Sequence, residues 1–431
     1  MVGISYRWRN LQREPERAEH YARRSAIASD LYKSGRKIID LHSGDAPLHK
    51  DDGLHNTVAD EHLIQAAKEG WDVYPGETAP IGGAGGKEDY RFKLRESICN
   101  FLKTHRHVSF SPEHVFVGHG VSGCFTILNN VLLDPGDEVV NIEPSHFFNT
   151  EGLGGIPIFQ GKLVTVSSDP DNRWEPDLEE LRVKISRRTK YIVVDHPTNP
   201  TGVVYSDKTL KSIIDIAGEN DLPLIVDEMY QLISYDDLKV KSVASLSEDV
   251  PTIVLSSTSK FWLLPGWSLG YAGFHDPEGK ITELENAVMR HAYYQGFAFS
   301  RIPTPIMVAA TRMFIDPKAI DFCFKKVKIV EQRRDFTYKR INEIEGISLK
   351  FKPQAALYTL LRIDEIGEKN SRWSNDREFV LDLFKEEGVY FHAGSNWGKS
   401  AFGHVRTLLY RNIEELTEAF DKLERFMKAK R

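Results

Sequence analysis

SSTSKFWLLPGWSLGY, residues 256–271, presents one lysine, Lys260, directly after the apolar and hydroxyl-rich run TIVLSSTS. The run predicts a β-strand that ends in a turn rich in serine and threonine. A lysine at such a turn can form an imine with an aldehyde, and the hydroxyls can hold an anionic group of the same ligand. Lys260 could equally be a solvated surface residue. The other stretches of the chain decide between these two interpretations.

Short apolar segments alternate with helical segments from about residue 110 to residue 275. We expect strands at 115–117, 138–142, 163–166, 191–194 and 224–226. Segments 191–194 and 224–226 are short and rich in β-branched residues, which is typical of buried parallel strands. The alternation predicts an α/β fold whose large domain has a mostly parallel central sheet with helices on both faces.

The pattern changes near Pro303, where longer amphipathic helices with a few strands begin. One helix should end at Gly388, and another should follow near the C-terminus. We therefore predict a large cofactor-binding domain at 57–302. A smaller α+β domain would be formed by both chain ends, 1–56 and 303–431.

The composition describes an ordinary soluble globular protein, with 431 residues, 41% hydrophobic and 27% charged. A net charge of −6 gives no reason to expect nucleic acid as a partner. Cys99, Cys124 and Cys323 show no metal-type spacing and fit reduced thiols of a cytoplasmic protein. The apolar runs are too short to span a membrane, and the N-terminus lacks the apolar region of a secretory signal.

Two turns follow the predicted central strands. HPTNPTG follows segment 191–194, and DEMY, which begins at Asp227, follows segment 224–226. Asp227 thus lies at the carboxyl end of a strand, where α/β sheets place their ligands. A buried carboxylate needs a cationic or protonated partner. The neighbouring residues in the sequence supply none, and a protonated ring nitrogen of a ligand would.

A further group of segments offers contacts for an anion or a planar ring. In VFVGHGVSG, residues Gly120, Val121 and Ser122 begin a predicted helix, where free N–H groups favour a phosphate. His146, in EPSHFFN, could cover a planar ring or be an ordinary loop histidine. Arg406 is expected to start a strand after a glycine-containing loop, and it could bind a carboxylate or lie on the surface of that strand.

Two glycine-containing loops lie nearer the N-terminus. Gly44, in HSGDAP, could let the backbone approach a ligand or could be an ordinary turn glycine. The segment YPGETAPIGGAGG lacks the ending of a nucleotide-binding P-loop. It predicts a mobile or interface loop, with Tyr74 at its start.

The order of these motifs resembles that of the fold type I pyridoxal-phosphate enzymes, and most closely the class I/II aminotransferase family. The motifs are HPTNPTG, DEMY, SSTSK with PGWSLGY, and a late glycine loop with Arg406. The likeness extends from about Gly44 to Arg406. It implies an enzyme that uses pyridoxal 5′-phosphate and a Lys260 aldimine to move an amino group from an L-amino acid to a 2-oxo acid.

The resemblance implies catalytic roles for three residues. Lys260 would form the aldimine and later move the proton between the substrate carbon and the cofactor. Asp227 would keep the pyridine nitrogen protonated, which makes the ring an electron sink. Tyr230, together with Asn199, would donate to the phenolate oxygen and lower the pKa of the aldimine.

It also implies how the cofactor phosphate is held. The amides and hydroxyl at Gly120, Val121 and Ser122 would bind the phosphate, joined by Ser257. Tyr74 would reach a phosphate across a dimer interface. We therefore expect a homodimer with shared active sites.

The remaining matches concern the ring and the substrate. His146 occupies the ring-stacking position, which is usually aromatic in the family. Gly44 and Arg406 would hold the substrate α-carboxylate. No metal is implied, and the sequence does not identify which amino acid or oxo acid is used.

One position departs from the family pattern. The PGW stretch usually continues with an arginine that pairs with the phosphate, and here that residue is Ser268. Arg290 or Arg301 could compensate, the cofactor could bind more weakly, or the reaction could differ. The alternative function is therefore a pyridoxal-phosphate-dependent elimination, cyclisation or oxidation of an amino acid in a biosynthetic pathway. A non-catalytic binding module is disfavoured, because Lys260, Asp227, Tyr230 and Asn199 are all retained.

Overall fold

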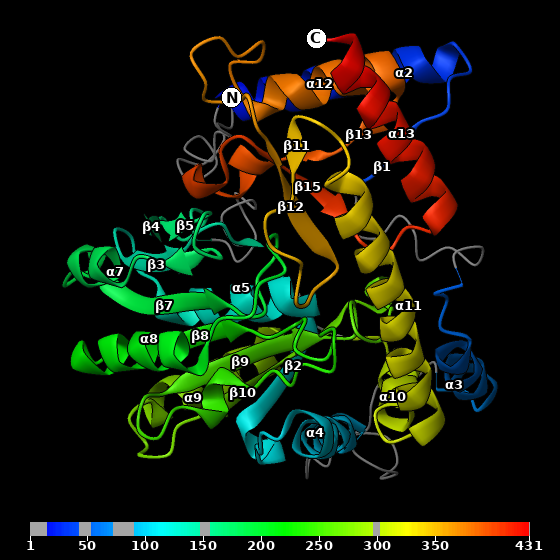
Figure 1. The fold of residues 1–431 in the computed structure, drawn as a ribbon. Coiled ribbons are helices and arrows are strands. Elements are labelled where there is room, and N and C mark those ends of the chain that lie inside the picture. Colours follow the sequence, from blue (N-terminus) through cyan, green and yellow to red (C-terminus); the bar gives the residue numbers. More distant parts are fainter. Residues whose placement is uncertain (1–14, 43–52, 72–89, 147–155, 296–301, 431) are drawn as a thin grey trace, which may run out of the picture.

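The computed structural model describes residues 15–42, 53–71, 90–146, 156–295 and 302–430. Gly44, Tyr74 and Arg301 lie outside the described residues. Figure 1 shows a large sheet with its helices in one half of the molecule and a smaller sheet with long helices above it. Within the described ranges, no helix is long and apolar enough to cross a membrane.

The large sheet has seven strands in the order β2-β10-β9-β8-β7-β3-β4. Strand β10 runs antiparallel to both of its neighbours, and the other neighbouring pairs are parallel. The predicted mostly parallel sheet is therefore confirmed. The strands are β2 Val115–His119, β3 Glu138–Ile142, β4 Lys162–Val166, β7 Thr189–Asp195, β8 Leu224–Asp227, β9 Thr252–Ser257 and β10 Leu269–His275.

Helices cover both faces of this sheet, as the sequence predicted. Alternate side chains of a strand point to opposite faces. On β7, Tyr191 packs edge to face against Phe125 of helix α5 (Gly120–Leu132), with the ring centroids 6.1 Å apart. Val194 instead belongs to a second core cluster together with Leu210 of helix α8 (Asp207–Glu219). Each fully buried apolar side chain of this kind contributes roughly 1.5–3 kcal/mol to stability.

The smaller sheet is antiparallel and has the order β11-β12-β15-β14. Helices from both ends of the chain accompany it, and Figure 1 shows α2, α12 and α13 together at this end of the molecule. Strand β1, near the N-terminus, pairs in parallel with β13, with Ile39 opposite Val389. The strands are β1 Ile39–Asp40, β11 Ile347–Ser348, β12 Tyr358–Ile363, β13 Val389–Tyr390, β14 His392–Ala393 and β15 His404–Leu408.

The helices not yet named are α2 Pro15–Lys33, α3 Thr57–Lys68, α4 Tyr90–Phe101, α7 Leu178–Lys184, α9 Thr282–Gln295, α10 Thr304–Met313, α11 Pro317–Ile341, α12 Asp376–Glu387 and α13 Ile413–Ala429. A short hairpin joins β5 Ser168–Asp169 to β6 Glu175–Pro176. Helix α10 packs against α3 and α4. The division into domains at 57–302, with 1–56 and 303–431 as the second unit, stays a prediction.

Local sequence signals account for two helix ends, at Ser206 and at Gly388. Ser206 precedes α8, and its hydroxyl accepts a hydrogen bond from the Thr209 N–H, the arrangement of an N-cap. Gly388 ends α12 with φ +74°, a conformation that glycine adopts without strain. Arg406 was expected at the start of its strand. It lies in the middle of β15 because the ladder with β12 already begins at His404, opposite Arg362.

Candidate active site

The candidate site lies where the carboxyl ends of the central strands meet the small sheet. Asp195 ends β7 and Asp227 ends β8, and the two residues are partners in the parallel ladder. The turn after β9 carries Lys260, and helix α5 begins nearby at Gly120. Open α/β sheets bind ligands at this edge, because the strand ends and helix N-termini leave polar backbone groups exposed there.

Lys260 is half-buried in a tightly bonded turn. Its carbonyl accepts the Leu263 N–H at 3.1 Å, and the Thr258 N–H donates to the Leu269 carbonyl at 2.9 Å. The Lys260 Nζ donates to the hydroxyl of Tyr358, on β12, at 3.2 Å. The lysine is therefore not a solvated surface residue, and it points toward the small sheet.

Asp227 is 2% exposed, and one carboxylate oxygen accepts the Met229 N–H at 3.0 Å. Within the described ranges, no lysine or arginine pairs with this carboxylate. Burial raises the pKa of Asp227 to about 7, against the opposing effects of the Met229 N–H, Arg106 and Lys260. A buried carboxylate in this state can accept a bond from a cationic or protonated partner.

Asp195 is a second buried carboxylate beside Asp227, and the sequence reasoning missed it. Its Oδ2 accepts the N–H groups of His146 and Asn199 at 3.3 and 3.2 Å, whereas its Oδ1 has no partner among the described residues. Burial, and then the neighbouring charge of Asp227, raise the pKa of Asp195 well above its ordinary value. Asp195 ends an apolar run just as Asp227 does, which is the signal that could have identified it.

A polar chain connects the two halves of the site. The Asn199 Nδ2 donates to the Tyr230 hydroxyl at 3.3 Å, and the Arg406 Nη1 donates to the Asn199 Oδ1 at 3.4 Å. The Gly202 carbonyl accepts the N–H groups of Gln354 and Ala355 at 2.9 and 3.0 Å. The turn that presents Asn199 is thereby fixed to the segment that leads into β12.

Arg406 is buried, and aromatic rings surround its guanidinium. Its Cζ lies 4.2 Å from the ring centroid of Tyr358 and 4.4 Å from that of Trp397. The Nη2 donates to the His42 carbonyl at 2.6 Å, and the Nε has no partner in the described part of the chain. Aromatic faces, the His42 carbonyl and the Asn199 side chain hold this cation but do not neutralise it, so it retains its charge for an anion.

His146 lies on the same side of the site. Its ring centroid is 5.9 Å from that of Trp397. Burial, followed by the charges of Lys260 and Arg406, lowers the pKa of His146 to about 3. The imidazole is consequently neutral near pH 7 and presents an uncharged ring.

The start of helix α5 offers free backbone donors, with one exception. The Gly120 N–H donates to the Ser268 carbonyl at 2.7 Å, so it is already used, whereas Val121 and Ser122 belong to the first turn, whose N–H groups have no partner within the helix. Gly120 has φ +61°, and a Cβ added to Gly270 would lie only 2.2 Å from the Gly120 carbonyl carbon. These two glycines allow β10 to approach the helix start closely.

Neither Arg290 nor Arg106 takes the place of the arginine that Ser268 replaces. Arg290 is exposed on α9, and its Nε donates to the carbonyl of Asn286 in its own helix. Arg106 is buried and donates to the Ser256 hydroxyl at 2.9 Å. Because side chains alternate along a strand, Arg106 lies on the opposite face of β9 from Ser257. The other candidate, Arg301, lies outside the described residues.

The structure therefore brings together Lys260, Asp227, Tyr230, Asn199 and Arg406, with His146, Ser257 and the α5 start around them. Gly44 and Tyr74 fall outside the described ranges. Sequence reasoning missed Tyr358 and Trp397 as well as Asp195. Nothing in the sequence around Tyr358 distinguishes a tyrosine that faces the site from one that belongs to the core.

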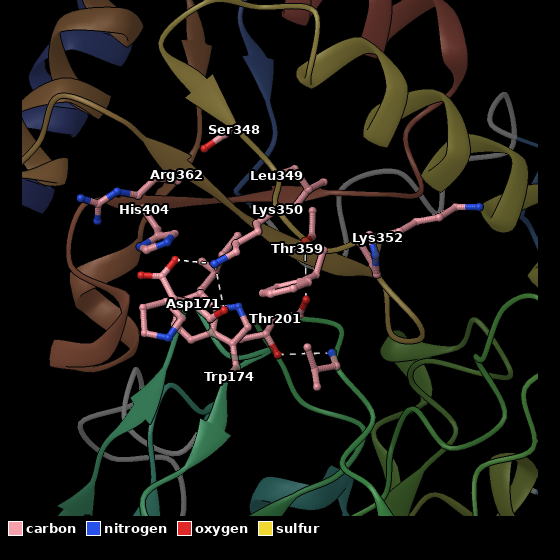
Figure 2. Close-up of a pocket in the computed structure, with 15 residues that line it drawn as sticks. Asp171, Trp174, Thr201, Ser348, Leu349, Lys350, Lys352, Thr359, Arg362 and His404 are labelled. Carbon is pink, nitrogen blue, oxygen red and sulfur yellow. Dashed lines mark hydrogen bonds and ion pairs between the residues drawn. The ribbon is translucent and has the colours of Figure 1, made fainter.

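A separate pocket lies between the β5–β6 hairpin and the small sheet, with a volume of about 230 Å³. Figure 2 shows Lys350 reaching Asp171 across it, while Lys352 and Arg362 extend away to opposite sides. The Lys350 Nζ donates to the Asp171 carboxylate at 2.8 Å and to its carbonyl at 2.9 Å. The candidate-site side chains do not line this pocket, and its central charges are paired with each other.

Comparisons with known proteins find relatives along nearly the whole chain. The family described as aminotransferase class I and II matches residues 37–423. A glutamate-pyruvate aminotransferase AlaA from Haemophilus influenzae is 29% identical over 349 residues, which cover 78% of this chain and 80% of the relative. The structure of an alanine aminotransferase from Pyrococcus furiosus is 35% identical, has a TM-score of 0.84 and covers 99% of this chain and 100% of its own.

An aspartate aminotransferase double mutant from Thermus thermophilus shares the fold, with a TM-score of 0.82 at 23% identity. It covers 99% of this chain and 100% of its own. An aspartate aminotransferase from a Bacillus species is 27% identical over 410 residues, or 94% of this chain and 95% of the relative.

Proposed function

Since the chain belongs to the class I and II aminotransferase family, we propose that Lys260 is the residue through which it binds pyridoxal 5′-phosphate and catalyses amino-group transfer. The chain is a transferase, and aminotransferase substrates are amino acids and oxo acids. One observation supports the cofactor assignment above all. A buried carboxylate without a cationic partner, Asp227, ends the strand adjacent to the one that precedes Lys260.

The described residues fit this cofactor in three respects. Asp227 is a carboxylate that a protonated ring nitrogen would pair with, which would restore its ionised form. Tyr230 and the Asn199 amide are joined by a hydrogen bond and supply donors for a phenolate oxygen. The first turn of α5, from Val121, leaves backbone N–H groups for a phosphate, and Ser257 adds a hydroxyl.

When bound, pyridoxal phosphate supplies an aldehyde for the amino group and an electron-withdrawing ring that stabilises negative charge on the substrate carbon. The protein would contribute position and proton transfer. Lys260 would take the proton from the substrate carbon at its Nζ and return it at the end of the reaction. Asp227 would hold a proton on the ring nitrogen, and His146 would present a neutral ring face to the cofactor.

Arg406 would bind the substrate α-carboxylate. Its guanidinium is already oriented by the Asn199 side chain and the His42 carbonyl, so little side-chain entropy is lost when the anion docks. Gly44, two residues after His42 in the chain, would add a backbone contact. We further propose a homodimer in which Tyr74 reaches the partner's phosphate site, and we expect a cytoplasmic location.

The proposal is tested by assaying the purified protein with amino acid and oxo acid pairs. The relatives are named as alanine, glutamate-pyruvate and aspartate aminotransferases. The first pairs to test are therefore alanine with 2-oxoglutarate, glutamate with pyruvate, and aspartate with 2-oxoglutarate. We expect stoichiometric transfer of isotopic nitrogen from donor to acceptor. Borohydride should fix the cofactor to the peptide that contains Lys260. Release of ammonia or consumption of oxygen without transfer would instead establish an elimination or an oxidation.

Arg406→Lys is expected to raise the KM for the amino acid by roughly 10- to 100-fold, because lysine cannot make the paired bonds of a guanidinium. The effect on kcat should be smaller, since the carboxylate is bound equally in the ground state and in the transition state. Steady-state kinetics measure both constants. Arg362→Lys, on the neighbouring strand of the same sheet, is the matched control and should leave KM unchanged. An unchanged KM in Arg406→Lys would show that this arginine does not bind the substrate carboxylate.

Ser268→Arg is expected to tighten cofactor binding by roughly 10- to 100-fold, because a hydrogen bond to a charged group contributes about 1.5–3 kcal/mol. Ser268 is partly exposed, and its carbonyl bonds to Gly120 at the helix start, so an arginine there can reach the phosphate. Calorimetric titration of the cofactor-free chain measures the dissociation constant. Pyridoxal, which lacks the phosphate, should bind the variant and the wild type with the same dissociation constant. An equal increase in affinity for pyridoxal would contradict the phosphate assignment.

A further inference from the structure

Asp195 joins two turns of the candidate site through a single carboxylate oxygen. Its Oδ2 accepts the N–H of His146 at 3.3 Å and the N–H of Asn199 at 3.2 Å. His146 comes after β3 and Asn199 after β7, so the two N–H groups belong to separate segments of the chain. The aspartate is only 6% exposed. Since buried N–H groups rarely go without a hydrogen-bond partner, this oxygen fixes the two segments relative to each other.

The sheet determines the direction in which Asp195 points. On β7, Val193 belongs to the core cluster that contains Phe125 of α5, and Val194 belongs to the cluster on the α8 side. Side chains alternate along a strand, so the Asp195 side chain lies on the α5 face. Asp227, its partner in the parallel ladder, lies on the same face. Asp195 is therefore adjacent to the carboxylate that is proposed to meet the ring nitrogen.

The two segments that Asp195 holds carry groups with different proposed tasks. The His146 ring would cover the cofactor ring. The Asn199 side chain contacts two other parts of the site, because its Nδ2 donates to the Tyr230 hydroxyl at 3.3 Å and its Oδ1 accepts a bond from the Arg406 Nη1 at 3.4 Å. A shift of the Asn199 backbone would therefore change the donors to the phenolate oxygen and the orientation of the arginine together.

We propose that Asp195 is a positioning residue that sets the places of His146 and Asn199 around the bound cofactor. This inference rests on the proposed function, because it adds a residue to the same site. It goes further by making one buried oxygen responsible for the separation between the group that covers the ring and the group that donates to the phenolate oxygen. Asp195 itself would touch neither the substrate nor the reacting atoms.

The proposal makes the acceptor oxygen of Asp195, and not its charge, the feature on which the site depends. Asp195→Asn removes the charge but keeps an oxygen that can accept both N–H groups, whereas Asp195→Ala removes the charge and the acceptor. An electrostatic role is the competing explanation, since the Asp195 Oδ1 has no partner among the described residues and Asp227 is its neighbour. An electrostatic role would make the two variants equally defective.

The first experiment measures hydrogen exchange in the full-length, cofactor-free chain. Mass spectrometry with fragmentation of the peptides gives the exchange rates at the amides of His146 and Asn199. Pro197 and Pro200 carry no N–H, which simplifies the assignment around Asn199. We expect Asp195→Ala to accelerate exchange at both amides by roughly three- to tenfold, the effect of losing one hydrogen bond. Asp195→Asn should keep the wild-type rates.

Asp376→Ala is the matched control for this experiment. Asp376 is also a buried aspartate that accepts N–H groups from two separate segments, at Ser395 and Gly403. Its removal should accelerate exchange at those two amides and leave the amides of His146 and Asn199 at their wild-type rates.

The second experiment separates positioning of the site from support of the fold. The pH titration of the absorption band of the lysine-bound cofactor reports the donors to the phenolate oxygen, because these donors favour the deprotonated form. In Asp195→Ala the midpoint should lie roughly half to one pH unit above that of Asp195→Asn, the size of one hydrogen bond. Asp195→Asn should retain the wild-type midpoint. A residue that only supported the fold would lower Tm in Asp195→Ala without moving the midpoint.

Unchanged exchange at His146 and Asn199 in Asp195→Ala would overturn the proposal, and so would equal midpoints in the two variants. If Asp195→Ala does not fold, Asp195→Asn still decides, because faster exchange or a shifted midpoint in that variant would refute the role of the acceptor. Isotopic nitrogen transfer and borohydride fixation at Lys260 test the proposed function separately. Their failure would refute that function, whereas the exchange rates in the cofactor-free chain concern Asp195 alone.

Discussion

The Lys260→Ala variant is expected to lose amino-group transfer by at least about 10⁴-fold in kcat, the upper range for one proton-transfer group, because both the covalent attachment and the proton carrier are removed. The geometry supports so large an effect. Lys260 lies in a turn that backbone hydrogen bonds of Thr258 and Leu263 hold in place. Its Nζ donates to the Tyr358 hydroxyl inside the candidate site.

The measurement combines kcat with the absorption spectrum of the purified variant. Added pyridoxal phosphate should still bind, through Asp227 and the helix start, but borohydride should no longer fix it to the chain. Lys280→Ala is the matched control, since that lysine is exposed and pairs with Glu278 at the surface. Fixation at another residue in Lys260→Ala, or activity within tenfold of the wild type, would show that a different amine performs the reaction.

Asp227→Asn is expected to lower kcat by roughly 10²- to 10³-fold, the range found when one preorganised electrostatic group is removed. An amide cannot hold the ring nitrogen in its protonated form. The substitution preserves volume, so the fold should be retained. Activity assays with the variant and with Asp171→Asn, an exposed aspartate, separate this loss from a general effect of charge removal.

The same variant makes a prediction about stability in the cofactor-free chain. The pKa of Asp227 is raised to about 7 by burial, so the folded state holds a proton that the unfolded state has released above about pH 4. Stability therefore falls as the pH rises through this window. Asp227→Asn removes that contribution and should flatten the decline in Tm between about pH 4 and pH 7. A decline as steep as in the wild type would contradict the raised pKa.

Much of the fold could be predicted from the sequence, because strands and helix ends are specified by residues that are close together in the chain. The β-branched runs at 191–194 and 224–226 are buried strands, Ser206 caps a helix, and Gly388 ends one. These features depend on residues close together in the chain. Arg406, by contrast, was expected to begin its strand. Its place in the middle of β15 depends on pairing with β12, about which the local sequence carries no signal.

The site was predictable only where a residue follows a recognisable strand or motif. Lys260, Asp227 and Asn199 satisfy that condition, and the structure brings their neighbourhood together. Asp195 satisfied it too, but the expected strand stopped at Val194, one residue too early. Tyr358 did not satisfy it, because its place in the site depends on how the small sheet docks on the large one. The proposed roles of Gly44 and Tyr74 stay predictions.

The pairing of β1 with β13 has a consequence for biosynthesis. The seven strands of the large sheet all fall between residues 115 and 275, so a growing chain can complete that sheet early. Ile39, however, has no partner until Val389 has been synthesised, and the His42 carbonyl must wait for Arg406. Such distant pairings form slowly. The nascent polypeptide therefore acquires Arg406, the residue proposed to bind the substrate carboxylate, only after the whole large sheet has been synthesised. We expect an unfinished chain on the ribosome not to bind amino acids even after its large sheet has folded.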